Sequence, residues 1–184
     1  MFRVVFALLF AIALAPPAPA FAREAAPPAV RDGSHDFDFE TGVWATRVRR
    51  LQKPLTGSTS WVEYEGTSTI VPLMNGAGNI VDLDIAGPAG RIAGVSLRLF
   101  NPDTGQWSLN FAPLGAGALT PPVFGSFRDG RGEFYGADTL GGRAILVRFV
   151  ISDITPTSAH FEQAFSADGG KTWEVNWIAD DTRR

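Results

Sequence analysis

From Val43 onward, apolar and polar residues alternate along the chain, and clusters of Gly, Pro, Asn and Asp interrupt the alternation about every ten residues. Successive side chains of a β-strand point to opposite faces of a sheet, so this alternation predicts strands with one apolar and one polar face. No stretch shows the spacing of an amphipathic helix. The pattern predicts ten strands, near residues 43–51, 59–71, 79–86, 91–100, 105–111, 122–128, 132–138, 143–151, 157–166 and 172–179.

The connections between these strands decide the architecture. Most of them are short, which requires antiparallel neighbours because a parallel pair needs a crossover of about a dozen residues or more. A long antiparallel meander leaves two unpaired edges unless it closes on itself. The sequence therefore predicts an all-β domain over residues 35–184, an antiparallel meander of about ten strands closed into a barrel.

Charge complementarity fixes the register of the first hairpin. Arg47 set opposite Glu65 and Arg49 set opposite Glu63 form complementary pairs on the outward face. The inward face then holds Trp44, Thr46, Val48, Arg50, Val62 and Tyr64. A slip of one residue would move a whole strand to the other face, so each register is a prediction in its own right.

Two further registers come from turns. The tight turn at residues 101–105 contains Pro and Gly and predicts that Leu99 faces Trp107. Its inward side chains are Val95, Leu97, Leu99, Trp107, Leu109 and Phe111, and its outward ones are Ser96, Arg98, Ser108 and Asn110. In the last three strands, the predicted pairs are Arg148 with Glu162 and Phe165 with Trp173. The inward side chains are then Ile145, Val147, Phe149, Phe161, Gln163, Phe165, Trp173, Val175 and Trp177, and the outward ones are Arg148, His160, Glu162 and Asn176.

The start of the chain has the pattern of a secretory signal peptide. A positive start at Met1–Arg3 precedes an unbroken apolar run, Val4–Ala15, and the small residues Ala20 and Ala22 form a cleavage site. The run is shorter than the ~20 residues that span a bilayer, which argues against a membrane anchor. We expect a signal peptide at 1–22, a disordered leader at 23–34, and a periplasmic or secreted protein without stable membrane insertion.

Composition and charge exclude several classes of protein. The 184 residues include no Cys, so the domain depends on its apolar core and not on disulfides. The formal net charge is -3, and the 16 Lys and Arg residues are scattered along the chain. A nucleic-acid partner calls for a basic stripe, so we expect none. Oligomeric state is left open.

Two resemblances agree with the barrel. Gly42-Val43-Trp44 at the start of the first strand and Arg183-Arg184 in the C-terminal segment resemble the lipocalin and fatty-acid-binding (calycin) pattern. In that pattern, Gly-x-Trp closes the barrel base and a late Arg packs on the indole. Segments at 37–39, 97–100, 152–156 and 166–173 look like those of a family of exported bacterial proteins of unknown function with a lipocalin-like barrel. This resemblance covers roughly residues 35–182, implies a fold, and transfers no catalytic residue.

The segment Ser166-Ala167-Asp168-Gly169-Gly170-Lys171-Thr172-Trp173 is similar to the Asp-box hairpin of sialidases and other secreted β proteins. In that hairpin, Ser and Asp side chains bond turn amides and the aromatic ring packs beneath them. The chain has one copy and no blade repeat, so this motif predicts a structural turn and not a propeller.

Motifs for catalysis are few. The chain has no Cys nucleophile, Gly-x-Ser-x-Gly elbow, phosphate-binding loop or His pair at metal spacing, and we expect no cofactor and no metal. His35 lies in a carboxylate-rich segment, residues 35–40, that we expect to be solvated, and a metal site formed by its oxygen ligands and imidazole is the alternative. His160 is placed outward, and haem ligation through it stays an alternative. Asp82 and Asp84 have the pattern of a half-solvated strand, with no partner to tune a pKa.

Polar side chains on the inward face are the most informative about function. A buried polar group needs a partner, which is another side chain, a water or a ligand. The predicted ligand-binding residues are Trp44, Arg50, Tyr64, Trp107, Phe161, Gln163, Phe165 and Trp177, and their alternative role is core packing. The Gly-rich loop at 112–122 is a candidate portal.

Three functions follow from these features. The first is binding of a small apolar or aromatic molecule inside the barrel, where a barrel of this size has room for one. The second is an enzyme acting in the same cavity, with Tyr64 as acid or electrostatic stabiliser. The third is an envelope interaction module using the outward face that carries Arg148, Glu162 and Asn176. Whether any reaction is catalysed is left open.

Overall fold

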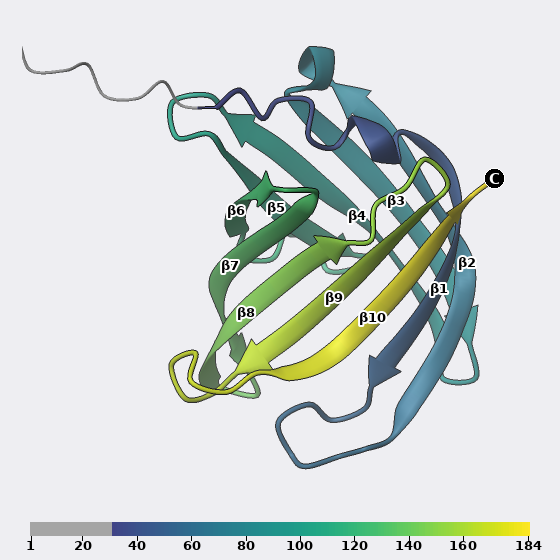
Figure 1. Cartoon of the computed structure of the whole chain (residues 1–184). Coiled ribbons are helices and arrows are strands. Elements are labelled where there is room, and N and C mark those ends of the chain that lie inside the picture. Colours follow the sequence, from purple (N-terminus) through teal and green to yellow (C-terminus); the bar gives the residue numbers. More distant parts are fainter. Residues whose placement is uncertain (1–30) are drawn as a thin grey trace, which may run out of the picture.

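Ten antiparallel strands close into a barrel in a computed structural model that describes residues 31–184 (Figure 1). The strands are β1 (Gly42–Leu51), β2 (Trp61–Leu73), β3 (Gly78–Gly87), β4 (Gly90–Asn101), β5 (Gln106–Pro113), β6 (Val123–Arg128), β7 (Arg131–Leu140), β8 (Arg143–Ser152), β9 (Ser158–Ser166) and β10 (Glu174–Arg183). Two short 3-10 helices, η1 (Asp38–Glu40) and η2 (Met74–Gly76), accompany them. The predicted fold class is confirmed.

The predicted signal peptide at 1–22 lies outside the described residues, and none of the helices described at 31–184 is long and apolar enough to cross a membrane.

Each strand pairs with its neighbour in sequence, and β1 pairs with β10 to complete the ring. The β1–β10 ladder runs from Trp44 opposite Arg183 to Arg50 opposite Trp177. The ladder between β5 and β6 is much shorter, from Trp107 opposite Gly125 to Leu109 opposite Val123. The ring therefore has one short seam, between β5 and β6.

The predicted register of the first hairpin is confirmed. Arg47 lies opposite Glu65 and Arg49 opposite Glu63, and the Arg47 Nε and Glu65 Oε1 atoms are 3.3 Å apart on the outer surface. The inward side chains Trp44, Thr46, Val48 and Tyr64 are buried. Outward charge pairing was therefore a reliable guide to the register of these two strands.

The predicted register between β4 and β5 is wrong by one residue. Leu99 lies opposite Ser108, and Trp107 lies opposite Phe100. The turn holds one more residue than expected, because the Asn101 side-chain oxygen accepts hydrogen bonds from the amides of Asp103 and Thr104. The slip inverts the whole of β4, so that Arg98 is buried inside the barrel and Val95, Leu97 and Leu99 face outward.

The registers of the last three strands also need correction. Arg148 lies opposite Ala164 and not Glu162, a shift of two residues that leaves every β8 and β9 side chain on its predicted face. A bulge between Val175 and Trp177 breaks the β9–β10 ladder, and Glu174 lies opposite Phe165. Trp173 therefore precedes β10 and stays outside, where the Arg148 Cζ atom lies 5.0 Å from its ring centroid.

The segment before β1 crosses the end of the barrel at which the C-terminus lies (Figure 1). The Trp107 Nε1–H donates to the carbonyl oxygen of Gly33 at 2.9 Å, so part of the predicted leader segment, residues 31–34, is held against the barrel. Phe37 packs edge-on against Trp107 and Phe127, with ring centroids 4.8 and 5.0 Å apart. We call this end, covered by residues 33–41, the closed end.

The expected clasp of the calycin pattern is present at the closed end. The Arg183 guanidinium lies over the Trp44 indole, with Cζ 4.3 Å from the ring centroid. The same guanidinium donates hydrogen bonds to the carbonyl oxygens of Phe39, Thr41 and Pro156. One side chain thus ties the last strand to the first strand, to the covering segment and to the β8–β9 loop.

The predicted Asp-box turn between β9 and β10 is also present. The Asp168 carboxylate accepts hydrogen bonds from the Thr172 amide and hydroxyl at 3.0 and 2.6 Å. Ser166 Oγ accepts a hydrogen bond from the Gly170 amide at 2.9 Å, and the Trp173 indole N–H donates to the Gly170 carbonyl oxygen. The two bonds from Thr172, with a smaller contribution from the bond that the Ser166 hydroxyl donates to Asp168, lower the pKa of Asp168 to about 2.

Candidate ligand cavity

A cavity of about 440 Å³ occupies the barrel, and all ten strands contribute to its wall. Its apolar lining consists of Val48, Val81, Leu83, Ile92, Leu109, Phe111, Pro113, Pro121, Val123, Ala137, Val147, Phe149, Phe161, Phe165, Trp177 and Ala179. Its polar lining consists of Glu40, Thr46, Arg50, Ser68, Ser96, Arg98, Asn110, Thr120, Asp138, Gln163 and Asp181. Arg50, Pro113 and Pro121 are exposed, so the cavity reaches solvent there.

The closed end of the cavity contains a buried ion pair. Arg98, turned inward by the register of β4, donates from Nη1 to the Glu40 carboxylate, and both side chains are at least 94% removed from solvent, with exposures of 6% and 2%. The Arg98 Cζ atom also lies 4.4 Å from the centroid of the Phe37 ring. The covering segment and the middle of the chain thus meet through one salt bridge.

Asp181 on β10 is a second acid at this end of the cavity. It is 5% exposed, and its Oδ1 atom has no hydrogen-bond partner among the described residues. Burial, with a contribution from the charge of Glu40, raises the pKa of Asp181 to about 7, while Thr46 and Arg98 act in the opposite direction. Thr46 lies opposite Asp181 in the β1–β10 ladder, and its hydroxyl shares a hydrogen bond of 2.7 Å with the hydroxyl of Ser68 on β2. Glu40, Thr46, Ser68, Arg98 and Asp181 together form what we call the polar end.

Five of the eight predicted ligand-binding residues line the cavity, namely Arg50, Phe161, Gln163, Phe165 and Trp177. The other three lie elsewhere in the barrel. Trp44 packs with Ile70 and Val81 and lies under Arg183. Tyr64 and Trp107 belong to the main apolar core, and neither forms part of the cavity wall.

Gln163 has a protein partner. Its Nε2–H donates to Asn176 Oδ1 at 2.9 Å, and Asn176 is buried at the bulge of β10. Asn176 was predicted to face outward with Arg148 and Glu162, and its burial removes it from the proposed outer interaction face. The bulge explains the difference, because the additional residue turns this amide toward Gln163.

The predicted portal loop borders the cavity at the short seam between β5 and β6. Pro113, Thr120 and Pro121 contribute to the cavity wall. Thr120 fastens the loop to β5, since its Oγ1 accepts a hydrogen bond from the Phe111 amide at 3.1 Å and its carbonyl oxygen accepts one from Asn110 Nδ2 at 3.0 Å. Leu114, at the tip, is 72% exposed.

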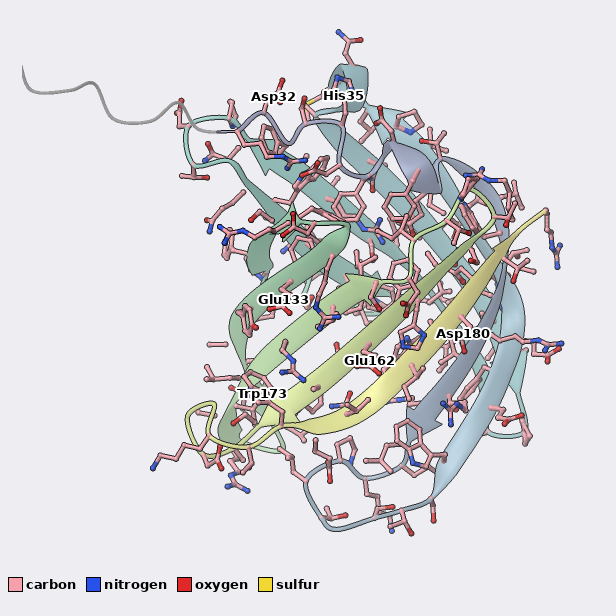
Figure 2. The ribbon with its side chains drawn as sticks, viewed as in Figure 1. Asp32, His35, Glu133, Glu162, Trp173 and Asp180 are labelled. Carbon is pink, nitrogen blue, oxygen red and sulfur yellow. The ribbon has the colours of Figure 1, made fainter. Side chains whose placement is uncertain are left out.

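The two histidines lie outside the cavity. His160 Nδ1 lies 2.7 Å from Asp180 Oδ1 and its Nε2 lies 3.4 Å from Glu162 Oε1, on strands β10 and β9. Figure 2 labels both carboxylates. Burial lowers the pKa of His160, but its hydrogen bonds to Asp180 and Glu162 outweigh that effect and raise it overall. His35 lies at the closed end beside Asp38. Nowhere in residues 31–184 are three or more His, Asp or Glu side chains placed to hold a metal ion.

Sequence reasoning placed Thr46 inward but named none of the five residues of the polar end as a binding residue, and it missed all three charged ones, Glu40, Arg98 and Asp181. Arg98 was placed outward by the one-residue slip, and Asp181 lies beyond the predicted end of its strand at residue 179. A signal for Asp181 was present, since the alternation Trp177, Ala179, Asp181 continues the inward face of β10. Nothing in the local pattern marks Glu40, because the covering segment has no strand or helix period.

Comparisons with known proteins identify structures with a similar fold. No protein-family model and no curated protein matches the chain. The S-type phycobiliprotein lyase CPES from Guillardia theta is similar in structure, with a TM-score of 0.59 and 11% identity over 84% of this chain and 93% of that one. A structure of EF1p2_mFAP2b bound to DFHBI gives a TM-score of 0.45 and 12% identity, covering 83% of this chain and 99% of that one. The likeness to the lyase shows a shared barrel fold.

Proposed function

We propose that this protein binds a small apolar or aromatic molecule inside its barrel. The observation that supports this proposal is the cavity of about 440 Å³, in which apolar lining residues outnumber polar ones and five of the polar ones gather at the polar end. Ligand sites have this composition and a volume of roughly 300–1,000 Å³. Protein interiors are normally close-packed, whereas the side chains of this barrel leave a volume of this size unfilled, which favours a ligand site over plain core packing.

The lining assigns roles to particular residues. Phe161, Phe165 and Trp177 offer flat apolar surface on adjacent strands, suited to an aromatic or aliphatic body. Arg50, at the solvent end, is free to swing because its side chain is exposed. Gln163 is oriented by Asn176, which uses one of its two N–H donors, so its side-chain oxygen and its second N–H are left for a ligand.

A fluorescent titration with Nile red tests this proposal. Ala179 lies on the cavity wall between Trp177 and Asp181, so Ala179→Phe fills part of the cavity. Ala86 is exposed on β3, and Ala86→Phe is the matched control. We expect wild type and Ala86→Phe to bind Nile red and Ala179→Phe to bind it at least tenfold more weakly, with circular dichroism showing that all three are folded. Equal binding by both variants would contradict a site inside the barrel.

An enzyme acting in the same cavity is the second candidate. The supporting observation is Asp181, a buried carboxyl on the cavity wall whose pKa of about 7 suits proton transfer at neutral pH. Tyr64, the acid first considered, is not on the wall. Ligand recovered from the native protein and incubated with it would change mass if a reaction occurs, and Asp181→Asn would stop that change. Unaltered ligand would rule out this candidate for that compound.

We propose export as well, to the periplasm or the medium, on the pattern of residues 1–22. The resemblance to exported bacterial proteins of unknown function supports the same location. Denaturing mass spectrometry of protein recovered from its exported fraction is the test. A chain starting at Arg23 is expected, and a chain retaining Met1 would contradict cleavage.

A further inference from the structure

We infer that the ligand of this cavity carries a hydrogen-bond donor, such as an amine, amide or hydroxyl, and that this donor enters first and bonds to Asp181 at the polar end. The inference rests on the proposed binding function and specifies the chemistry of the ligand. It also predicts that the polar end does not receive a carboxylate or another anion.

One carboxyl oxygen of Asp181 lacks a hydrogen-bond partner in the described part of the chain. Asp181 is 95% buried, at 5% exposure, and its Oδ1 has no donor among residues 31–184. A buried acceptor without a partner costs free energy comparable to a lost hydrogen bond, so such atoms mark the place of a missing partner. Because Asp181 lies on the cavity wall, a molecule in the cavity is able to supply that partner.

Arg98 carries the only guanidinium at the polar end. A carboxylate that enters the polar end needs a free cation there, and Arg98 is the cation at that end. However, Arg98 already donates from both Nη atoms to Glu40, and its face packs on the Phe37 ring. An anionic ligand would have to compete with a resident carboxylate for the same N–H groups.

The charges of the side chains at the polar end also disfavour an anion. The groups facing Asp181 are Glu40, Arg98 and Thr46, and Asp180 lies next to it on the outer face. Two carboxyls and one guanidinium share the buried polar end, so their summed charge is zero with Asp181 protonated and negative with Asp181 ionised. Neither state offers an anion a net positive charge, and an ionised Asp181 accepts a donor strongly.

The apolar lining gives the direction of entry. The polar end lies under the covering segment, whereas the exposed Arg50, Pro113 and Pro121 mark the solvent end. A molecule with one donor group therefore places that group at the closed end and its apolar body against Phe161, Trp177 and neighbouring side chains. The result is an end-on, oriented complex.

Three probes with one ring system test the inference: anthracene, 1-aminoanthracene and anthracene-1-carboxylate. We expect wild-type protein to bind the amine about tenfold or more tightly than the carboxylate, and more tightly than the parent hydrocarbon. Asp181→Leu is expected to bind amine and hydrocarbon alike. The matched control is Asp180→Leu, which changes the next residue, an exposed acid on the outer face, and keeps the preference for the amine.

A second measurement avoids the variant altogether. The side-chain carboxyl of Asp181 in wild-type protein, observed by 13C NMR, is expected to shift on addition of 1-aminoanthracene and to stay unchanged with anthracene. Equal affinities for amine and carboxylate, or a preference for the amine that survives in Asp181→Leu, would overturn the inference while leaving cavity binding in place. Failure of the folded wild-type protein to bind any of the three probes would overturn both.

Discussion

Arg98 and Glu40, separated by 58 residues in sequence, form a buried ion pair that fastens the segment before β1 to the inside of β4. The pair seals the closed end of the barrel and forms one wall of the cavity. Both charges lie away from water, so each depends on the other for its stability.

Removal of one partner of this pair should be costly. We expect Arg98→Met to lower the free energy of unfolding by about 3–5 kcal/mol, because it leaves Glu40 as a buried, uncompensated charge. Urea denaturation measures the change. Arg91→Met is the matched control, since its ion pair with Asp84 is exposed and screened by water, and it should have little effect. A double variant, Glu40→Leu with Arg98→Met, should recover most of the loss.

The clasp of Arg183 on Trp44 should contribute to stability through several bonds at once. Arg183→Met removes hydrogen bonds to three carbonyl oxygens and the contact with the indole. We expect a loss of about 2–3 kcal/mol in thermal or urea unfolding. Arg184→Met, at the exposed neighbouring residue, should have almost no effect. Equal losses for the two variants would show that the clasp has no special role.

The stability that the Asp-box turn contributes should decrease at acid pH. The pKa of Asp168 is lowered from 3.8 to about 2, so its stabilising effect is complete above 3.8 and is lost as the pH falls through 2. Asp168→Ala should therefore lower the melting temperature at pH 7. The difference from wild type should shrink between pH 4 and pH 2, and a constant difference across this range would show that ionisation of Asp168 is not the cause.

The stability contributed by Asp181 should depend on pH with the opposite sign. Its pKa is raised from 3.8 to about 7, so the stability it lends is complete below 3.8 and is lost as the pH rises through 7. Relative to wild type, Asp181→Asn should thus gain stability between pH 4 and pH 8, by at most about 4 kcal/mol. Urea midpoints at intermediate pH values measure this gain. A flat difference would mean that Asp181 titrates near its ordinary value.

Gln163→Leu separates binding from folding. Removal of the Nε2 donor leaves the buried Asn176 Oδ1 without its partner, which should cost about 1–3 kcal/mol of stability. The barrel should still fold, and affinity for Nile red should fall only if the Gln163 side chain contacts the probe. Unchanged affinity at full folding would assign Gln163 to the support of the β10 bulge alone.

Much of this barrel was predictable from alternation and turn residues. The strand order, the antiparallel ring and the inward face of the first hairpin all follow from local pattern and outward charge pairs such as Arg47 with Glu65. The Asp-box turn and the clasp of Arg183 on Trp44 follow from short motifs. These features are local, or depend on residue types whose partners are few.

The polar end was not predictable in the same way, for two physical reasons. Leu97 and Leu99 are apolar yet face outward, where they are half-buried, so hydrophobicity favoured the wrong face of β4. The length of the turn then decided the register, and the side chain of Asn101 lengthened it. The pairing of Arg98 with Glu40 also needs the covering segment in place, and this contact has no trace in a local pattern.

Pairing of β1 with β10 sets a condition on the order of folding. Hairpins between successive strands form locally, but the hydrogen bond from Arg183 Nη1 to the Thr41 carbonyl oxygen spans 142 residues. Closure of so long a loop is entropically costly and slow, and it has to wait until β10 has left the ribosome. Until then β1 and β9 present unpaired edges of the kind that recruit other strands. Aggregation during synthesis is therefore the particular hazard of this ring, and rapid docking of β10 is the step that ends it.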